Sequence, residues 1–314
     1  MTTVTVILIV LAANYLVMDL VGSVLIFLMI IYRSPRTPRT RDCVETKNVE
    51  KIDMFAQGLE WSRRHVEQTR QLEVVSVGLK LYGEYVDFGY EKCAVILQGR
   101  TESLIYSYYY ADVYASSGHN ILVIDIRAHG LSDGKYHTSG IRESDDLIVW
   151  IDFMRKTYGI EDFTVHGVCV GGATAVYAYH KMLSRESLPI RRIVTDGLFI
   201  TNFEMFRRNM RDYWQPAFPT LHITFLLAKL LAKVDLFKET PIRYMPEIRI
   251  PFLFIWSVED RYCMPDKGKQ LFAACASKSK SMQFFPKGRH SHVRYCQPEA
   301  YDSVISDFLA LQDH

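Results

Sequence analysis

A cysteine stands at the centre of a short, glycine-bounded segment, Gly167-Val168-Cys169-Val170-Gly171. The apolar run Phe163–Val165 leads into this segment, and the alanine-rich run Ala173–Val176 follows it. A nucleophile elbow has this same succession of strand, sharp turn and helix, usually with serine at the position of Cys169. The glycines let neighbouring backbone pass close to a strained turn without a Cβ clash. The pattern therefore predicts that Cys169 is a thiol nucleophile.

A thiol nucleophile needs a base within hydrogen-bond reach and a third group that orients the base. In chains that carry the elbow, the order along the sequence is nucleophile, then acid, then histidine. Asp260 follows the apolar run Phe252–Trp256 and is the predicted acid, although its neighbour Glu259 is also a carboxylate. His290 lies in the loop after another short apolar run and is the predicted base, with His292 as its competitor. The residues alone leave the two histidines open.

The oxyanion that develops during acyl transfer needs hydrogen-bond donors held in place before the reaction. In elbow-containing folds these donors are two backbone N–H groups, one of which directly follows the nucleophile. That position is Val170, and we assign the second donor to Arg100, which follows the predicted strand Ala94–Gln98. The predicted oxyanion hole is therefore formed by the backbone of Val170 and Arg100.

The histidines and cysteines do not favour a metal centre. His290, His292 and Cys296 are close in sequence, but no second pair of ligands has a suitable spacing. We therefore expect neither a metal nor a cofactor. The six cysteines show no C-x-x-C spacing and no dense framework, a usage typical of reduced thiols in a reducing compartment.

Alternating strands and helices must position these groups. Short, continuous apolar runs predict strands buried on both faces, which is typical of a parallel sheet. The predicted strands are Leu72–Val77, Leu79–Phe88, Ala94–Gln98, Ile121–Ile126, Phe163–Val168, Ile193–Asp196, Phe252–Trp256 and Met282–Phe285. The predicted helices are Tyr106–Ser116, Ile141–Tyr158, Gly172–Leu183, Lys267–Ala276 and Ala300–Leu311. This order predicts an α/β fold with a doubly wound, mostly parallel sheet.

One segment, about 199–247, breaks the alternation because it is rich in aromatic and long apolar residues. We interpret it as a small helical cap over the carboxyl edge of the sheet, where such folds bind ligands. Its stretch Leu221–Val234 is amphipathic, which fits an ordinary packed helix pair or a lid that touches a membrane equally well.

The N-terminal segment Val6–Tyr32 is almost entirely apolar and long enough to cross a hydrocarbon core of about 30 Å. No basic residue precedes it and no small-residue cleavage site ends it, so we predict an anchor rather than a cleaved signal peptide. Inserting Asp19 into the membrane costs a free energy of roughly 2.5–3.5 kcal/mol, which the surrounding aliphatic residues can offset. We interpret Asp19 as tolerated polarity rather than as a contact with a partner in the membrane.

Four arginines follow this segment directly: Arg33, Arg36, Arg39 and Arg41. The positive-inside rule then predicts a single-pass protein whose C-terminal domain lies in the cytoplasm. The predicted organisation is an anchor over residues 1–33, a linker and helical stretch over 34–71, and a catalytic domain over 72–314. The helical stretch, about Val49–Gln71, carries mixed charge and one apolar face.

The 314 residues, 49% of them hydrophobic, suffice for one sizeable domain plus a small appendage. The net charge of +2 gives no reason to expect nucleic-acid binding. The expected partners are therefore a small-molecule acyl substrate and the membrane. The sequence does not indicate an oligomeric state.

Beyond the elbow, the segment Asp125-Ile-Arg127-Ala-His-Gly130-Leu-Ser132-Asp-Gly134 resembles the D-x-R-x-x-G-x-S-x-G loop of α/β-hydrolases. More closely, residues 72 to 311 resemble the membrane-anchored bacterial α/β-hydrolases of the serine aminopeptidase-like and prolyl-oligopeptidase-like group. In that group the catalytic histidine lies eight positions before a Pro-Glu pair, and this count selects His290 over His292. The resemblance implies an α/β-hydrolase fold with a nucleophile, acid and base at Cys169, Asp260 and His290.

The chain departs from that group at three places. Cys169 replaces the serine, Gln98-Gly99 replaces a His-Gly pair, and Val170-Gly171 replaces a Met-Gly pair. A similar Cys-His-Asp set occurs in dienelactone hydrolases on the same fold, which implies that a thiol elbow can be productive. We therefore expect a hydrolase of small esters, thioesters or lactones, with peptides less favoured. The alternatives are a catalytically inactive binding protein and an acyltransferase.

Overall fold

The computed structural model describes residues 2–33, 40–42, 46–212 and 216–311. Its centre is one eight-stranded sheet in the order β1-β2-β4-β3-β5-β6-β7-β8. All eight predicted strands are present, with ends displaced by a few residues. They are β1 (Thr69–Ser76), β2 (Leu79–Val86), β3 (Lys92–Leu97), β4 (His119–Ile124), β5 (Asp162–Val168), β6 (Ile190–Asp196), β7 (Phe252–Ser257) and β8 (Lys280–Phe285).

The strands from β3 to β8 are parallel to one another, whereas β1 pairs with β2, and β2 with β4, in the antiparallel sense at one edge. Every residue of β4 and β7 is buried, as is nearly all of β3 and β5. This burial on both faces explains why the sequences of these strands are continuous apolar runs rather than alternating apolar and polar residues. The parallel strands bring their carboxyl ends to one edge of the sheet, where the elbow and the loop after β7 lie.

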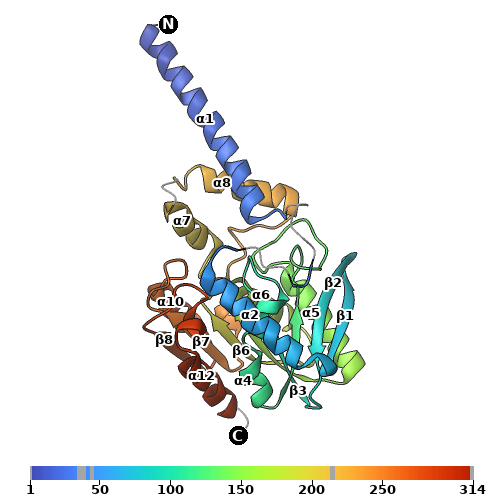
Figure 1. Cartoon of the computed structure of the whole chain (residues 1–314). Coiled ribbons are helices and arrows are strands. Elements are labelled where there is room, and N and C mark those ends of the chain that lie inside the picture. The colour runs from blue at the N-terminus through green and yellow to red at the C-terminus, as the bar shows by residue number, and fades with distance from the viewer. Residues whose placement is uncertain (1, 34–39, 43–45, 213–215, 312–314) are drawn as a thin grey trace.

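Helices cover both faces of the sheet (Figure 1). They include α2 (Val49–Arg64), α5 (Glu143–Tyr158), α6 (Val170–Met182), α10 (Pro265–Ala274) and α12 (Pro298–Ala310). The helix predicted over Tyr106–Ser116 is instead two short helices, α3 (Leu104–Tyr108) and α4 (Ala111–Ser116). Tyr108, Tyr109 and Tyr110 at this break are all buried. A regular helix with one apolar face would expose part of such a run, so the break allows all three rings to be buried.

The segment predicted as a cap is helical and lies between β6 and β7. It contains α7 (Asn202–Asp212), α8 (Thr220–Leu227), a π-helical turn η2 (Ala228–Ala232), α9 (Pro241–Tyr244) and η3 (Met245–Glu247). The amphipathic stretch Leu221–Val234 corresponds to α8 and η2, and its Leu226, Leu230 and Leu231 are exposed. Tyr213 and Trp214, two aromatic residues of this segment, lie outside the described residues.

The N-terminal helix α1 (Thr3–Ile30) projects as a long rod from the domain, and α8 lies across its base (Figure 1). It is long and apolar enough to cross a membrane. The Thr220 hydroxyl of α8 donates to Asp19 Oδ1 at 2.5 Å, and the Thr224 hydroxyl donates to the Ser23 carbonyl at 3.1 Å. The interpretation of Asp19 as merely tolerated polarity is therefore wrong, because its carboxylate binds the cap within the same chain.

The end of α1 is also fixed to the domain by the backbone. His137 N donates to the Ile31 carbonyl at 2.7 Å, and Arg33 N donates to the Lys135 carbonyl at 2.8 Å. The Arg33 guanidinium donates to the carbonyls of Gly130 and Ser132. Anchor and domain therefore meet as packed surfaces at this point. Of the other three arginines, Arg41 pairs with buried Glu84 of β2, while Arg36 and Arg39 lie outside the described residues.

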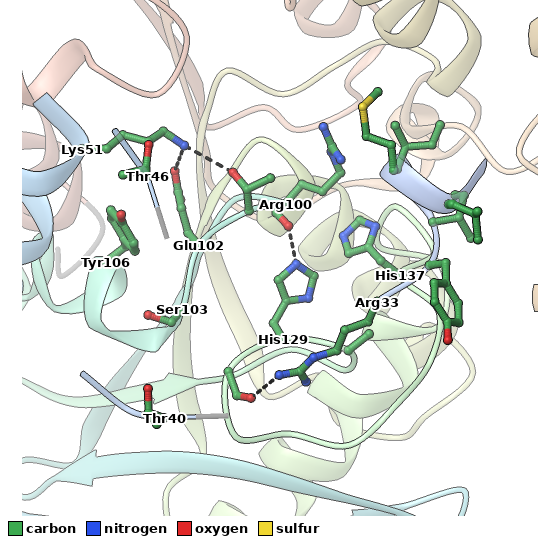
Figure 2. Close-up of a pocket in the computed structure, with 18 residues that line it drawn as sticks. Arg33, Thr40, Thr46, Lys51, Arg100, Glu102, Ser103, Tyr106, His129 and His137 are labelled. Atoms are coloured by element: carbon green, nitrogen blue, oxygen red, sulfur yellow. Dashed lines mark hydrogen bonds and ion pairs between the residues drawn. The ribbon is translucent and has the colours of Figure 1, made fainter. Parts of the chain in front are cut away.

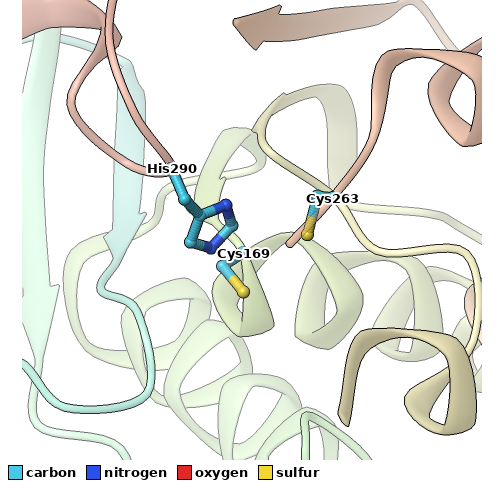
Figure 3. A group of neighbouring side chains, drawn as sticks. All are labelled: Cys169, Cys263 and His290. Carbon is cyan, nitrogen blue, oxygen red and sulfur yellow. The ribbon is translucent and has the colours of Figure 1, made fainter. Parts of the chain in front are cut away.

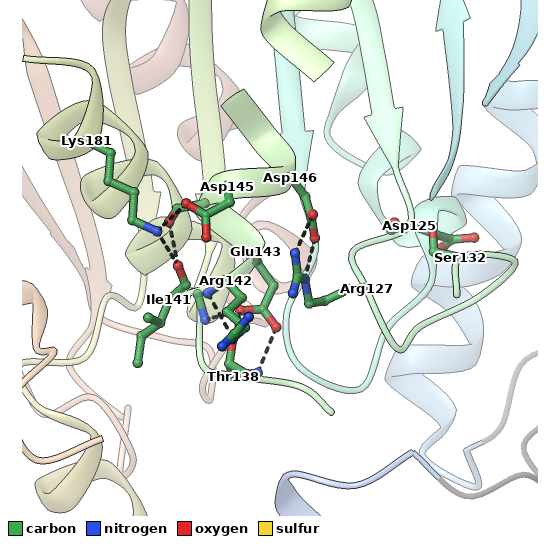
Figure 4. A network of polar contacts seen from close by, with 12 residues as sticks. Asp125, Arg127, Ser132, Thr138, Ile141, Arg142, Glu143, Asp145, Asp146 and Lys181 are labelled. Atoms are coloured by element: carbon green, nitrogen blue, oxygen red, sulfur yellow. Dashed lines mark hydrogen bonds and ion pairs between the residues drawn. The ribbon is translucent and has the colours of Figure 1, made fainter. Parts of the chain in front are cut away.

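The Asp125–Gly134 loop is held by its own side chains (Figure 4). Asp125 accepts hydrogen bonds from the backbone of Leu104 and Leu131, both at 2.8 Å. Gly130 has a φ of +44°, and a Cβ at this position would lie 2.0 Å from the Asp125 carboxylate. Arg127 pairs in a bidentate manner with Asp146 of α5 at 2.6 Å. These buried contacts give the loop motif a structural role rather than a catalytic one.

We predict that Asp125→Ala lowers the free energy of unfolding by about 2–4 kcal/mol, because two buried N–H groups lose their acceptor. The measurement is urea unfolding of the full chain in detergent, followed by tryptophan fluorescence. Glu73→Ala is the control, because Glu73 is 57% exposed and forms its ion pair with exposed Lys80. It should change the free energy by less than about 0.5 kcal/mol. Equal effects of the two substitutions would contradict the role of Asp125.

Candidate active site

Cys169 lies between β5 and α6 with a φ of 51° and a ψ of −103°, the sharp turn that the elbow pattern predicts. Its N–H donates to the Asp196 carbonyl at 2.8 Å. A Cβ on Gly167 would lie 2.2 Å from the Gly171 carbonyl carbon, and one on Gly171 would lie 2.4 Å from the Leu97 carbonyl oxygen. Both positions therefore need glycine, because strand β3, strand β5 and helix α6 touch there through their backbones.

Asp260 lies in the loop after β7 and is buried. Its Oδ1 accepts hydrogen bonds from the backbone of Tyr262 and Cys263, both at 2.8 Å. Its Oδ2 lies 2.7 Å from Nδ1 of His290. The carboxylate is therefore held by three donors and orients the imidazole ring. Gly197 has a φ of +65° and leaves room for this pair, since a Cβ there would lie 3.0 Å from Cε1 of His290.

The structure brings Cys169 and His290 together, with Cys263 beside them (Figure 3). One ligand atom from each of these residues lies within 4.8 Å of the other two. His292 is directed elsewhere, with Nδ1 at 2.6 Å from the His290 carbonyl and Nε2 at 3.4 Å from Glu50. Glu259 accepts a hydrogen bond from Gly288 N at 3.1 Å rather than contacting His290. The geometry therefore groups Cys169, Asp260 and His290 and leaves out both competitors.

The charges in this group favour a thiolate and an imidazolium. A hydrogen bond from Cys263 lowers the pKa of Cys169 to about 5. The positive charge of His290 contributes to this shift, whereas burial of the thiol opposes it. Burial alone would lower the pKa of His290, but Asp260 and the Cys169 thiolate raise it well above its usual value. Both shifts favour the charged pair of a thiolate and an imidazolium over the neutral pair.

The two predicted oxyanion donors lie at the sheet edge beside Cys169. Val170 is the first residue of α6, and Arg100 follows β3. Neither backbone N–H has a hydrogen-bond acceptor within the part of the chain that the structure describes. The N-terminus of α6 adds the positive end of a helix dipole at the same place.

Glu102 and Lys51 support this edge, and the sequence analysis missed both. Glu102 is buried, accepts a hydrogen bond from Gly99 N at 2.9 Å, and pairs with Lys51 of α2 at 3.0 Å. The pair fixes the loop that carries Arg100. Because its members are 51 positions apart, no local pattern could have indicated it.

Cys263 is the other site residue that sequence reasoning missed. Its only sequence signal is its place three residues after Asp260, in the loop that must reach the elbow. With Cys169 and His290 it offers two sulfurs and a nitrogen, a set that suits Zn²⁺. The same sulfur and nitrogen are the groups that the acyl chemistry needs, so a metal and this chemistry exclude each other.

A cavity of about 560 Å³ opens beside the loop of Arg100 (Figure 2). One wall is the last turn of α1 and the residues after it, including Met29 and Ile31. The opposite wall carries polar groups, among them Arg100, His129 and His137. The cavity therefore joins an apolar surface to a basic one beside the loop of Arg100, and Cys169 is not among its lining residues.

The model of the alpha/beta hydrolase fold family matches residues 95–230. An uncharacterised protein of Bacillus subtilis, YqkD, is 26% identical over 218 residues, which cover 68% of this chain and 70% of that protein. An esterase of Pyrococcus furiosus superposes with a TM-score of 0.65 at 20% identity, covering 79% of this chain and 93% of the esterase. An esterase of Exiguobacterium antarcticum gives 0.56 at 14% identity, covering 77% and 100%. The predicted fold is thereby confirmed: this chain has the α/β-hydrolase fold.

Proposed function

We propose that this protein is a cysteine-dependent hydrolase that cleaves small esters, thioesters or lactones through an acyl-enzyme. The observation that carries the proposal is the alignment of Asp260, His290 and Cys169. Asp260 holds Nδ1 of His290 at 2.7 Å, and a ring nitrogen of His290 lies within 4.8 Å of the Cys169 sulfur. An activated nucleophile uses this order of groups, in which a carboxylate orients the base and the base lies beside the thiol.

In the first half of the reaction, the Cys169 thiolate attacks the acyl carbon and a carbon–sulfur bond forms. The negative charge moves to the carbonyl oxygen, to which the N–H groups of Val170 and Arg100 donate hydrogen bonds. The tetrahedral intermediate then collapses, the bond to the leaving group breaks, and the His290 imidazolium protonates the leaving alkoxide or thiolate. Asp260 stabilises the imidazolium throughout.

In the second half, neutral His290 removes a proton from a water molecule as the water attacks the thioester carbon. The second tetrahedral intermediate uses the same two donors, and its collapse releases the carboxylic acid product and regenerates the thiolate.

Esters and thioesters suit this scheme because their leaving groups need little protonation. Amide substrates are less suited, because their amine must be protonated before it leaves. The esterases among the structural neighbours support the same substrate class.

We also propose that α1 anchors the enzyme in a membrane as a single span, with the catalytic domain on the cytoplasmic side. The length and apolar composition of α1 support the span. The orientation rests on the four arginines that follow α1 in the sequence.

We predict that Cys169→Ala lowers kcat/KM for p-nitrophenyl butyrate and for an acyl thioester by about 10³-fold or more, because the nucleophile is lost. The full chain is assayed in detergent, and Cys296→Ala, which removes an exposed thiol, is the control. Mass spectrometry should detect an acyl group on Cys169 in the wild type. Turnover that survives both Cys169→Ala and iodoacetamide would refute the thiol mechanism. Loss of turnover with EDTA would instead indicate metal chemistry.

The ion pair predicts an unusual pH dependence of alkylation. The rate at which iodoacetamide modifies Cys169 should rise with pH through about 5, where the thiol loses its proton. Burial raises the pKa of Cys296, so its alkylation should begin only at alkaline pH and serves as the reference in the same sample. His290→Asn removes the neighbouring cation and should move the Cys169 midpoint upward by at least about one pH unit. Equal midpoints for Cys169 and Cys296 would favour a non-catalytic binding protein.

A further inference from the structure

The first inference concerns the basic side of the cavity beside the loop of Arg100. Three cations line it: Arg33, Lys51 and Arg100. Lys51 is paired with Glu102, and Arg33 donates to the carbonyls of Gly130 and Ser132. Within the described residues, the Arg100 guanidinium has neither a hydrogen-bond nor an ion-pair partner, so its charge faces the cavity. Figure 2 shows this side chain extending away from His129.

The neighbouring histidines do not compete for an anion as charged groups. Burial lowers the pKa of both His129 and His137, so both are neutral at physiological pH. Burial lowers the pKa of Arg100, and the charge of Cys169 opposes that shift. Arg100 therefore lines the cavity with its side chain and interacts electrostatically with the nucleophile.

We propose that the Arg100 guanidinium binds an anionic group of the substrate, a carboxylate or a phosphate, close to the acyl carbon. The planar guanidinium matches both anions through bidentate hydrogen bonds. The apolar wall of Leu28, Met29 and Ile31 receives the hydrocarbon part of the same molecule. The inference rests on the proposed function and narrows its substrate class to acidic amphiphilic acyl esters or thioesters. Arg100 thus has two roles, with its backbone at the oxyanion and its side chain at the anion.

The first test compares p-nitrophenyl hydrogen glutarate with its methyl ester, which differ by one negative charge. The quantity compared is kcat/KM for the acid divided by kcat/KM for the methyl ester. Arg100→Met should lower this ratio by about tenfold, because a charge-assisted hydrogen bond to the acid is lost. Arg100→Lys keeps the charge but loses the bidentate hydrogen bonding of the guanidinium, so it should give an intermediate ratio. Arg289→Met removes an exposed arginine that pairs with Glu50 and should leave the ratio unchanged. An unchanged ratio in both Arg100 variants overturns the proposal.

The second test needs no turnover. Iodoacetate and iodoacetamide modify the same sulfur but differ in charge, and peptide mass spectrometry reads the rate at each cysteine. The rate ratio of iodoacetate to iodoacetamide should be higher at Cys169 than at exposed Cys296, and it should fall about tenfold in Arg100→Met. A high ratio without ester turnover would keep the anion site and refute the hydrolase. Ester turnover with equal alkylation ratios at both cysteines would keep the hydrolase and refute the anion site. Protection of Cys169 by glutarate or by phenyl phosphate identifies the preferred anion.

A second, independent observation concerns Cys263, a buried thiol that forms no covalent bond in the acyl mechanism. Its sulfur lies within 4.8 Å of the Cys169 sulfur, and its N–H is fixed by Asp260. We infer that Cys263 acts as a resolving cysteine when a peroxide reaches the site. The Cys169 thiolate attacks a peroxide oxygen to give a sulfenic acid, and the Cys263 thiol then displaces water from it. One hydrogen peroxide and two thiols give one disulfide and two waters, and an external dithiol then reduces the disulfide to the two thiols and is itself oxidised.

The test treats the full chain with hydrogen peroxide and maps the cysteines by mass spectrometry. The wild type should form a Cys169–Cys263 disulfide and recover fully with dithiothreitol. Cys263→Ala should instead accumulate sulfinic and sulfonic acid on Cys169, and at least half of its Cys169 should resist reduction. Cys275→Ala, which removes another buried thiol, should behave as the wild type. Absence of the cross-link in the wild type, or equal recovery in Cys263→Ala, overturns the inference.

Discussion

The backbone turn at Cys169 constrains the rest of this site. A residue with positive φ and a side chain is strained, and here it is held because the surrounding backbone is packed without side chains. Gly167 touches Gly171, Gly171 touches the Leu97 carbonyl, and the Cys169 N–H is bound by Asp196. These contacts join β3, β5, β6 and α6 at one point. The thiol, the first N–H of α6 and the loop after β3 therefore have fixed relative positions.

The groups that act on the thiol come from the same edge of the sheet. The loop after β7 supplies Asp260, and the loop after β8 supplies His290. Gly197, at the end of β6, leaves room for both. A parallel sheet makes this convergence possible, because each strand delivers its next loop to the same side. The histidine and carboxylate are thus positioned by strand order, and their distance in sequence is irrelevant.

Much of this arrangement could be predicted from local patterns. The apolar runs marked all eight strands, and the glycine-bounded cysteine marked the elbow. The pairs that depend on distant segments could not be predicted in this way. Lys51 with Glu102, Thr220 with Asp19 and Cys169 with Cys263 each join residues from different elements, and none follows from periodicity or spacing. The split between α3 and α4 had the same origin, since burial of three adjacent tyrosines depends on what packs around them.

The contact between Asp19 and Thr220 fixes the depth of the cap. Above this contact α1 extends over residues 3–18, about 24 Å of helix, which is less than a hydrocarbon core of about 30 Å. If α1 spans the bilayer as proposed, the exposed Phe218, Leu226, Leu230 and Leu231 then lie among acyl chains or lipid headgroups. The end of α1 also lines the cavity, so under the same proposal an amphiphilic substrate reaches it from the lipid. Its substrate supply is then governed by mole fraction in the lipid, so dilution with inert lipid slows turnover even when the bulk substrate concentration is constant.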